Sequence, residues 1–316
     1  MFAPDGAGEV RRDDDLAAIL VDVLGSASPL ADGDVVLVTS KVVSKAEGRV
    51  VAGTREEALP GETARVVARR GPTRIVRTHH GLTLAAGGID ASNVVAGHVV
   101  LLPLDPDASA RALRARLREL TGRNVAVLVT DTAGRPWRAG QTDLAVGAAG
   151  RRVLEDCTGR QDDHGTHLVE TAPAVADELA GAAELAQGKL GARPFAVVRG
   201  RSDLVLAASD DGPGATALVR PEGDEMFGWG AREAVLRALR GDPADRTPFG
   251  GAASVAEMAE ALTALAGTEP EPDGAGLRLT GSAASVEAVR ALAFAHGWTV
   301  TADHGDGRLR LQPAHP

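Results

Sequence analysis

The sequence predicts a mixed α/β protein that consists of a large domain and a small C-terminal α+β module. Apolar runs of strand length and stretches of helical periodicity mix along the whole chain. Neither GxGxxG nor GxxxxGK[ST] occurs, so a Rossmann or P-loop domain has no support. The run DPADRTPFGGAA, within Gly241–Ala253, is typical of a linker. We therefore expect domains at residues 1–245 and 252–316.

Composition narrows the class of protein. Of the 316 residues, 44% are hydrophobic and 24% charged, as in ordinary soluble domains. The net charge is -9 with no extended basic face, which argues against a nucleic-acid partner. The single cysteine, Cys157, excludes an intrachain disulfide and any multi-cysteine metal site. No apolar run is long enough to cross a bilayer and no signal peptide opens the chain, so we expect a cytoplasmic protein without a membrane partner.

The large domain is expected to open with a helix and a buried strand. The acidic turn Asp13 to Asp15 favours a helix at Leu16–Leu24. Six apolar, mostly β-branched residues in Val35–Val43 predict a buried strand. Glu62 and Arg65 lie at helical spacing. The further elements expected before the linker are a helix at 60–70, strands at 73–78 and 99–104, a helix at 107–120, a strand at 125–129, a glycine-rich stretch at 140–150, a helix at 174–186, a strand at 195–198 and a helix at 231–240.

The C-terminal module is expected to be small and to mix helices with strands. Its predicted order is a helix at 255–266, the strand LRLTG, a second helix, and the strands WTVTADH and GRLRLQP. About 65 residues suffice for such a module. The sequence does not reveal its role.

Polar side chains follow the apolar run at 35–38. They are Thr39, Ser40, Lys41, Ser44 and Lys45. Hydroxyl and ammonium groups at a strand exit suit the oxygens of a phosphate chain. The alternative is that both lysines simply extend into solvent at the end of the strand.

Acidic residues lie where other strands end or loops begin. Asp90 stands in GGIDASN, Asp131 in VLVTDTAGR and Asp143 in GQTDLAVG. Carboxylates in such places bind Mg²⁺ together with waters and phosphate oxygens, and the Thr132 hydroxyl could complete the shell. The alternative is that each aspartate caps a turn. Arg135 and Arg138 are candidates for carboxylate or phosphate recognition, unless they only form surface ion pairs.

Together these segments resemble the coenzyme F420-0:L-glutamate ligase family, which adds glutamate to the deazaflavin coenzyme F420. The resemblance spans residues 1 to 240 and is closest to the actinobacterial branch. In that branch a nitroreductase-like flavin domain often follows, but too few residues follow Phe249 for one. The matching segments are GDVVLVTSKVVSKAEGRVV, GGIDASNV, LLPLDPDASA, VLVTDTAGRPWRAGQTDLAVGAAG, DELAGAAELAQGKL and PFAVVRG.

The resemblance implies a non-Rossmann F420 γ-glutamyl ligase-like fold, a homodimer, and GTP, L-glutamate and coenzyme F420-0 as substrates. It implies Mg²⁺ or Mn²⁺, with two divalent ions as one arrangement, and K⁺ as a further cation. A metal and nucleotide segment of archaeal members aligns near 187–191, where this chain departs from the pattern with Lys189. The implied residues are Asp90, Asp131 and Thr132 for metal, and Ala7, Gly8, Glu9, Val10, Ser40, Lys45 and Asn93 for the nucleotide. As catalytic residues we predict Lys45, Asp131 and Arg135, with Arg135 a candidate for an incoming carboxylate.

Two other functions use the same residues. A metal-dependent nucleotide phosphohydrolase would release phosphate without glutamate. A non-catalytic nucleotide- or deazaflavin-binding protein would bind GTP without turnover. The intact set of Ser40, Lys45, Asp90, Asn93 and Asp131 argues against the binding protein, because a protein that only binds a nucleotide need not keep metal ligands. The number of glutamates added depends on pocket geometry and is not given by the sequence.

Overall fold

The structure, a computed structural model, describes residues 1–303 and 308–314. The chain divides into two compact units, one made of residues 1–65 and 75–219 and the other of residues 66–74 and 220–316. The predicted boundaries at 245 and 252 stay a prediction. The predicted mixture of helices and sheets is confirmed. No helix among the described residues combines the length and apolarity needed to span a membrane.

A four-stranded mixed sheet forms the centre of the first unit, in the order β8-β7-β1-β9. Strand β1 (Val35–Thr39) runs parallel to β7 (Ala126–Arg135) and antiparallel to β9 (Phe195–Val198). Strand β8 (Arg138–Ala149) pairs antiparallel with β7. The residues of β1 up to Val38 are fully buried, as expected for a strand covered on both faces.

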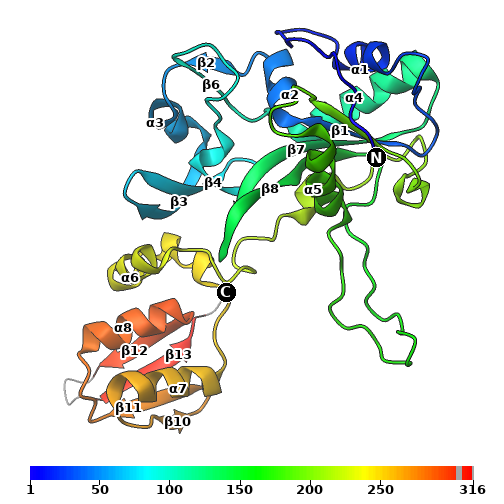
Figure 1. Cartoon of the computed structure of the whole chain (residues 1–316). Helices are drawn as coiled ribbons and strands as arrows, with labels where there is room; N and C mark the ends of the chain where they lie inside the picture. The colour runs from blue at the N-terminus through cyan, green and yellow to red at the C-terminus, as the bar shows by residue number, and fades with distance from the viewer. Residues whose placement is uncertain (304–307, 315–316) are drawn as a thin grey trace. The chain divides into compact units, whose positions relative to one another are not determined.

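Helices cover both faces of this sheet (Figure 1). Helices α1 (Leu16–Leu24) and α4 (Pro106–Thr121) pack on one face. Helix α5 (Val175–Gln187) packs on the other. Between β8 and α5 the chain leaves the body as a long arm, held by backbone pairs such as Gly159 N to Leu168 O at 2.9 Å (Figure 1).

Shorter elements complete this part of the chain. They are α2 (Ser40–Ala46), β2 (Val50–Ala52), α3 (Arg55–Ala58), β3 (Thr63–Arg70), β4 (Thr73–Thr78), β5 (Thr83–Ala85), β6 (His98–Val100) and the 3₁₀ turns Leu59–Glu62, Ala86–Gly88, Ser202–Leu204 and Ala215–Leu218. Strands β2 and β6 pair with each other, and β3, β4 and β5 form a three-stranded sheet. The β6 strand and the 3₁₀ turn at 86–88 flank the loop that carries Asp90.

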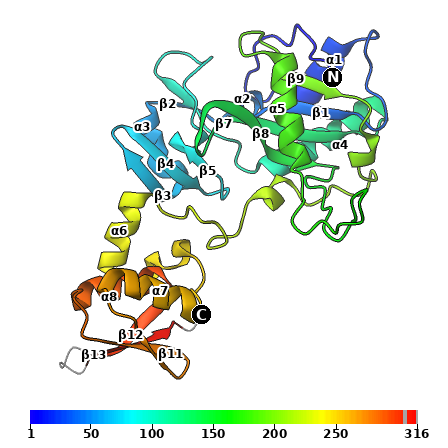
Figure 2. The ribbon, with the colours of Figure 1, turned by 60° about the horizontal axis from the view of Figure 1, so that its bottom comes forward.

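The second unit contains an antiparallel sheet in the order β10-β11-β13-β12, with helices α7 and α8 packed against it (Figure 2). Met258, Leu262 and Trp298 belong to its core. The predicted ends at 304 and 307 of its last two strands lie outside the described residues. Its elements are α6 (Ala231–Arg240), the 3₁₀ turns Pro243–Asp245 and Thr247–Phe249, α7 (Val255–Ala266), β10 (Glu271–Asp273), β11 (Gly276–Thr280), α8 (Val286–Ala295), β12 (Trp298–Asp303) and β13 (Arg308–Pro313).

Two predicted elements differ in type from the structure. The strand expected at Val35–Val43 ends at Thr39, and α2 begins at Ser40. The repeat SKVVSK places serines and lysines four residues apart, which is a helical period that outweighs the β-branched valines. The helix expected at 60–70 is instead the end of the 3₁₀ turn Leu59–Glu62 followed by strand β3. Strand β3 pairs with β4, so sheet pairing decides the conformation here. Glu62, at the end of the preceding 3₁₀ turn, pairs with Arg49 at 2.9 Å.

The glycine-rich stretch at 140–150, for which the sequence predicted neither helix nor strand, belongs to strand β8 as far as Ala149. Its small residues let helix α4 approach closely, because a side chain on Gly147 would place its Cβ 2.2 Å from the Pro106 carbonyl oxygen. The strand expected at 125–129 continues through Arg135, because β8 pairs with β7 over this whole length. The strand expected at 99–104 is shorter and ends at Val100.

Candidate functional site

Parallel pairing brings Ser40 and Asp131 together. Strands β1 and β7 are in register up to Thr39 and Thr130, so the next residue of each chain segment emerges at the same edge of the sheet. The Ser40 hydroxyl donates a hydrogen bond of 2.8 Å to Asp131 Oδ1. Ser40 is buried, which fixes this contact at the turn between β1 and α2.

The Asp131 carboxyl has an unusual protonation equilibrium. Burial, together with the negative charges of Asp143 and Asp90, raises its pKa to about 6, although the hydrogen bond from Ser40 opposes the shift. A carboxylate that is buried next to other carboxylates is costly unless a cation compensates it. The site therefore favours a positive charge close to Asp131.

Asp90 contributes a second carboxylate from the loop before β6. Its backbone pairs with Val100 in an isolated bridge. Lys41 Nζ lies 2.5 Å from Asp90 Oδ2, and the Ser92 backbone N–H donates to Oδ1 at 2.7 Å. Burial would raise the Asp90 pKa, but the Lys41 ammonium and the Ser92 hydrogen bonds hold it below its usual value. Asp90 is therefore ionised at neutral pH.

Helix α2 places Lys45 beside the N-terminal segment 7–10. Lys41 and Lys45 lie four residues apart, on one side of the helix. Lys45 is buried, and its Nζ lies 2.6 Å from Glu9 Oε1. Ala7 packs against the core of the first unit and Val10 is buried within it, which holds the segment 7–10 beside this lysine. A nucleotide that entered here would meet Lys45 and the backbone of 7–10 together.

Thr132 lies on the opposite face of β7 from Asp131, because side chains alternate along a strand. Its register partner is Asp143 in β8. The Thr132 hydroxyl donates to Asp143 Oδ1 at 2.7 Å and accepts from Lys189 Nζ at 2.8 Å. Lys189 Nζ also lies 3.9 Å from Glu184 Oε1 at the end of α5. Burial, with a contribution from the charge of Asp143, raises the Glu184 pKa.

A divalent ion is compatible with the Asp90 and Asp131 carboxylates. Hard cations such as Mg²⁺ take one or two carboxylates and complete their shell with waters and phosphate oxygens. Among residues 1–303 and 308–314, no three His, Cys, Asp or Glu side chains form a ready-made metal cluster. The donor set thus suits an ion that arrives with a phosphorylated substrate, not a closed structural site.

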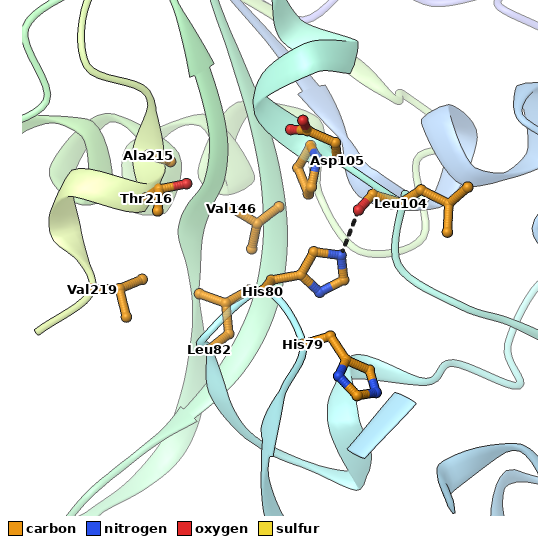
Figure 3. Close-up of a pocket in the computed structure, with 10 residues that line it drawn as sticks. His79, His80, Leu82, Leu104, Asp105, Val146, Ala215, Thr216 and Val219 are labelled. Carbon is orange, nitrogen blue, oxygen red and sulfur yellow. Dashed lines mark hydrogen bonds between the residues drawn. The ribbon is translucent and has the colours of Figure 1, made fainter. Parts of the chain in front are cut away.

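A separate cavity of about 310 Å³ opens in the same unit (Figure 3). His80 Nε2 lies 2.8 Å from the Pro103 carbonyl oxygen and 3.1 Å from that of Leu104, so Nε2 carries the proton. None of the predicted site residues lines the cavity. The lining residues are His79, His80, Leu82, Leu104, Asp105, Pro106, Val146, Ala215, Thr216 and Val219.

Comparisons with known proteins agree on one family. The profile of F420-0:Gamma-glutamyl ligase matches residues 6–71 and 55–200. The chain belongs to the F420-0:gamma-glutamyl ligase family. It is 39% identical over 222 residues to the coenzyme F420:L-glutamate ligase of Archaeoglobus fulgidus, covering 63% of this chain and 87% of that protein. The protein of the same name from Methanopyrus kandleri is 40% identical over 239 residues, covering 69% and 93% respectively.

The structure brings together most of the residues that the ligase-family resemblance implied. Ser40 contacts Asp131, and the charges of Asp90 and Asp131 interact. Asn93 lies in the exposed loop after Asp90, with a φ of 56°. Arg135 is not brought to Asp131. It lies at the tip of the β7–β8 hairpin, roughly 13 Å further along the strand, and donates to the Ala139 carbonyl oxygen.

The sequence predicted Lys41 only as a possible phosphate contact, and Lys189 only as a departure from the family pattern. Lys41 contacts Asp90, and Lys189 contacts Thr132. A signal in the sequence was available. The chain has 34 lysine and arginine residues, of which only Lys41, Lys45 and Lys189 are lysines. All three lie within hydrogen-bonding distance of a residue predicted for the ligase site. In a chain that otherwise uses arginine, the remaining lysines indicate places where a compact ammonium is needed.

Proposed function

We propose that this chain ligates L-glutamate to coenzyme F420-0 with GTP as the energy source. The observation that carries the proposal is the edge of the central sheet, where Ser40 contacts Asp131 and Lys41 contacts Asp90. Carboxylates that hold a cation beside ammonium groups suit a triphosphate. The names of the similar archaeal proteins, given above, supply glutamate and coenzyme F420 as the other reactants.

Amide formation from a carboxylate needs an activated acyl group. In the proposed reaction the γ-phosphoryl group of GTP passes to the terminal carboxylate of coenzyme F420-0, which gives an acyl phosphate and GDP. The amine of glutamate then attacks the acyl carbon, loses a proton and expels phosphate. Phosphoryl transfer depends mainly on positioning and on neutralising charge.

Each residue has a proposed role in that transfer. Lys45, buried beside the 7–10 segment, binds phosphate oxygens of the nucleotide. Ser40 orients the Asp131 carboxylate through its 2.8 Å hydrogen bond. A Mg²⁺ or Mn²⁺ ion held by Asp90 and Asp131 would neutralise charge on the transferred phosphoryl group. Asn93 is proposed to contact the nucleotide, and Arg135 to meet a carboxylate at the far end of a long substrate.

An isotope experiment tests the acyl-phosphate step. Coenzyme F420-0 labelled with ¹⁸O in its terminal carboxylate is incubated with GTP, Mg²⁺, K⁺ and L-glutamate. The proposal expects one ¹⁸O atom in each phosphate released, because the carboxylate oxygen leaves with the phosphoryl group. Glutamyl product with unlabelled phosphate would refute this activation step and leave the ligase activity itself intact. Omitting K⁺ from the mixture tests the proposed role of that ion.

A homodimer is also part of the proposal. Light scattering on the purified chain measures its mass directly. A mass near twice 32.3 kDa is expected. A mass near 32.3 kDa at the concentrations used for assay would contradict the dimer.

A further inference from the structure

Two groups of polar side chains lie on opposite faces of β7. On one face Asp131 contacts Ser40 and interacts electrostatically with Asp90. On the other face Thr132 contacts Asp143. Because consecutive residues of a strand point to opposite faces, the Thr132 hydroxyl and the Asp131 carboxylate do not face one common point within the strand. One cation could therefore not contact both side chains from a single face of the strand.

The chain itself supplies a positive charge beside Thr132. Helix α5 ends at Gln187, and Gly188 adopts a φ of 67°, which turns the chain out of the helix just before Lys189. Lys189 Nζ then lies 2.8 Å from Thr132 Oγ1 and 3.9 Å from Glu184 Oε1. The Thr132 hydroxyl gives its only proton to Asp143, so its lone pairs remain for the ammonium.

Lysine scarcity supports a specific role for this ammonium. Lys189 is one of three lysines among 34 basic residues, and the other two contact Asp90 and Glu9. A solvent-exposed cation without a function would as easily be arginine in this chain. Lysine differs from arginine because its ammonium is a compact point charge with three hydrogen-bond donors. It therefore resembles a bound metal cation more than a planar guanidinium does.

We propose that Lys189 takes the place of a second metal ion, so that the site binds a single divalent ion at Asp90 and Asp131. This inference rests on the proposed nucleotide-dependent function. The Lys189 ammonium provides the positive charge on the Thr132 side, with Asp143 and Glu184 as its counter-charges. A second divalent ion would have to displace it from Thr132 and would meet its repulsion.

Counting bound metal tests the proposal without any turnover. The purified chain is equilibrated with Mn²⁺ and a non-hydrolysable GTP analogue, and bound Mn²⁺ per chain is measured by electron paramagnetic resonance. The wild type is expected to bind one ion. Lys189→Gln removes the ammonium and adds an amide oxygen, so this variant is expected to bind two. Lys189→Arg keeps the charge and is the matched control, expected to bind one.

The substitutions should not unfold the protein, because the Lys189 side chain is 66% exposed. All three proteins should therefore have similar melting temperatures. Two ions on the wild type would overturn the proposal, and so would one ion on Lys189→Gln. The count also separates this proposal from the ligase function. A failure to form glutamyl product would refute the ligase and leave the count unchanged, whereas glutamyl product from a two-ion wild type would refute only the role of Lys189.

Discussion

Replacing Asp131 by asparagine separates stability from function at the centre of the site. The variant keeps a side-chain oxygen that can accept the Ser40 hydrogen bond. It removes the negative charge of the carboxylate, which is destabilised by burial and by the charges of Asp143 and Asp90. At pH 8 without metal we therefore expect Asp131→Asn to be more stable than the wild type. We also expect it to lose nearly all ligation, because a neutral amide binds a divalent ion poorly.

The size of the effect follows from the pKa. Burial first, and then the neighbouring charges, raise the Asp131 pKa from an ordinary value of 3.8 to about 6. A shift of about two units corresponds to about 3 kcal/mol at most. Between these values the folded wild type binds more protons than the unfolded chain, so its free energy of unfolding decreases as pH rises. The cost is complete above the folded pKa and absent below the unfolded one.

Thermal unfolding followed by circular dichroism measures this difference at pH 4, 6 and 8 in a chelator. A gain of about 3 kcal/mol would raise the melting temperature by roughly 6–12 °C for a unit of this size. Asp156→Asn, on the exposed arm, is the control and should change stability by less than about 0.5 kcal/mol. An Asp131→Asn variant that is less stable at pH 8, or whose difference from wild type ignores pH, would refute the electrostatic argument.

Three further predictions follow from other contacts. Asp90→Asn should weaken Mn²⁺ binding by more than about tenfold in calorimetry, because losing even a residue that only supports a metal ligand costs about that much affinity. Unchanged affinity would show that Asp90 is not a metal ligand. Arg114 is buried and donates to the Val125 carbonyl oxygen at 2.9 Å, so Arg114→Met leaves this acceptor unpaired and should cost about 1–3 kcal/mol in urea unfolding. The more exposed Arg118→Met should cost less than about 1 kcal/mol. Gly147→Ala should cost about 1–3 kcal/mol by pushing α4 from β8, and a neutral effect would contradict that close approach.

Much of the fold could be predicted where local signals and tertiary packing agree. The helix Leu16–Leu24, the strand Phe195–Val198 and the helices Ala231–Arg240 and Val255–Ala266 have the predicted bounds. In Leu16–Leu24 the preceding Asp15 accepts hydrogen bonds from the first turn, as an acidic cap should. Prediction failed where packing overrode local preference. Strand β8 is rich in glycine and alanine, and only the close approach of α4 explains that composition.

The site was partly predictable for a physical reason. Ser40 and Asp131 each come shortly after an apolar run of a strand, and parallel pairing of β1 with β7 places them side by side. The contacts of Lys41 and Lys189 depend on where a loop and a helix end meet the sheet, which local patterns do not encode. Asp131 and Thr132 take opposite faces because β7 continues beyond Val129, and the sequence predicted that this strand ends there.

The most direct test measures phosphate release and product mass together. The purified chain is given GTP, Mg²⁺ and coenzyme F420-0, with and without L-glutamate. A ligase releases one phosphate for each glutamyl unit added to the product, and releases almost none when glutamate is absent. Phosphate release at the same rate without glutamate would indicate a nucleotide hydrolase, and GTP binding without any release would indicate a binding protein. Either result would contradict the proposed function.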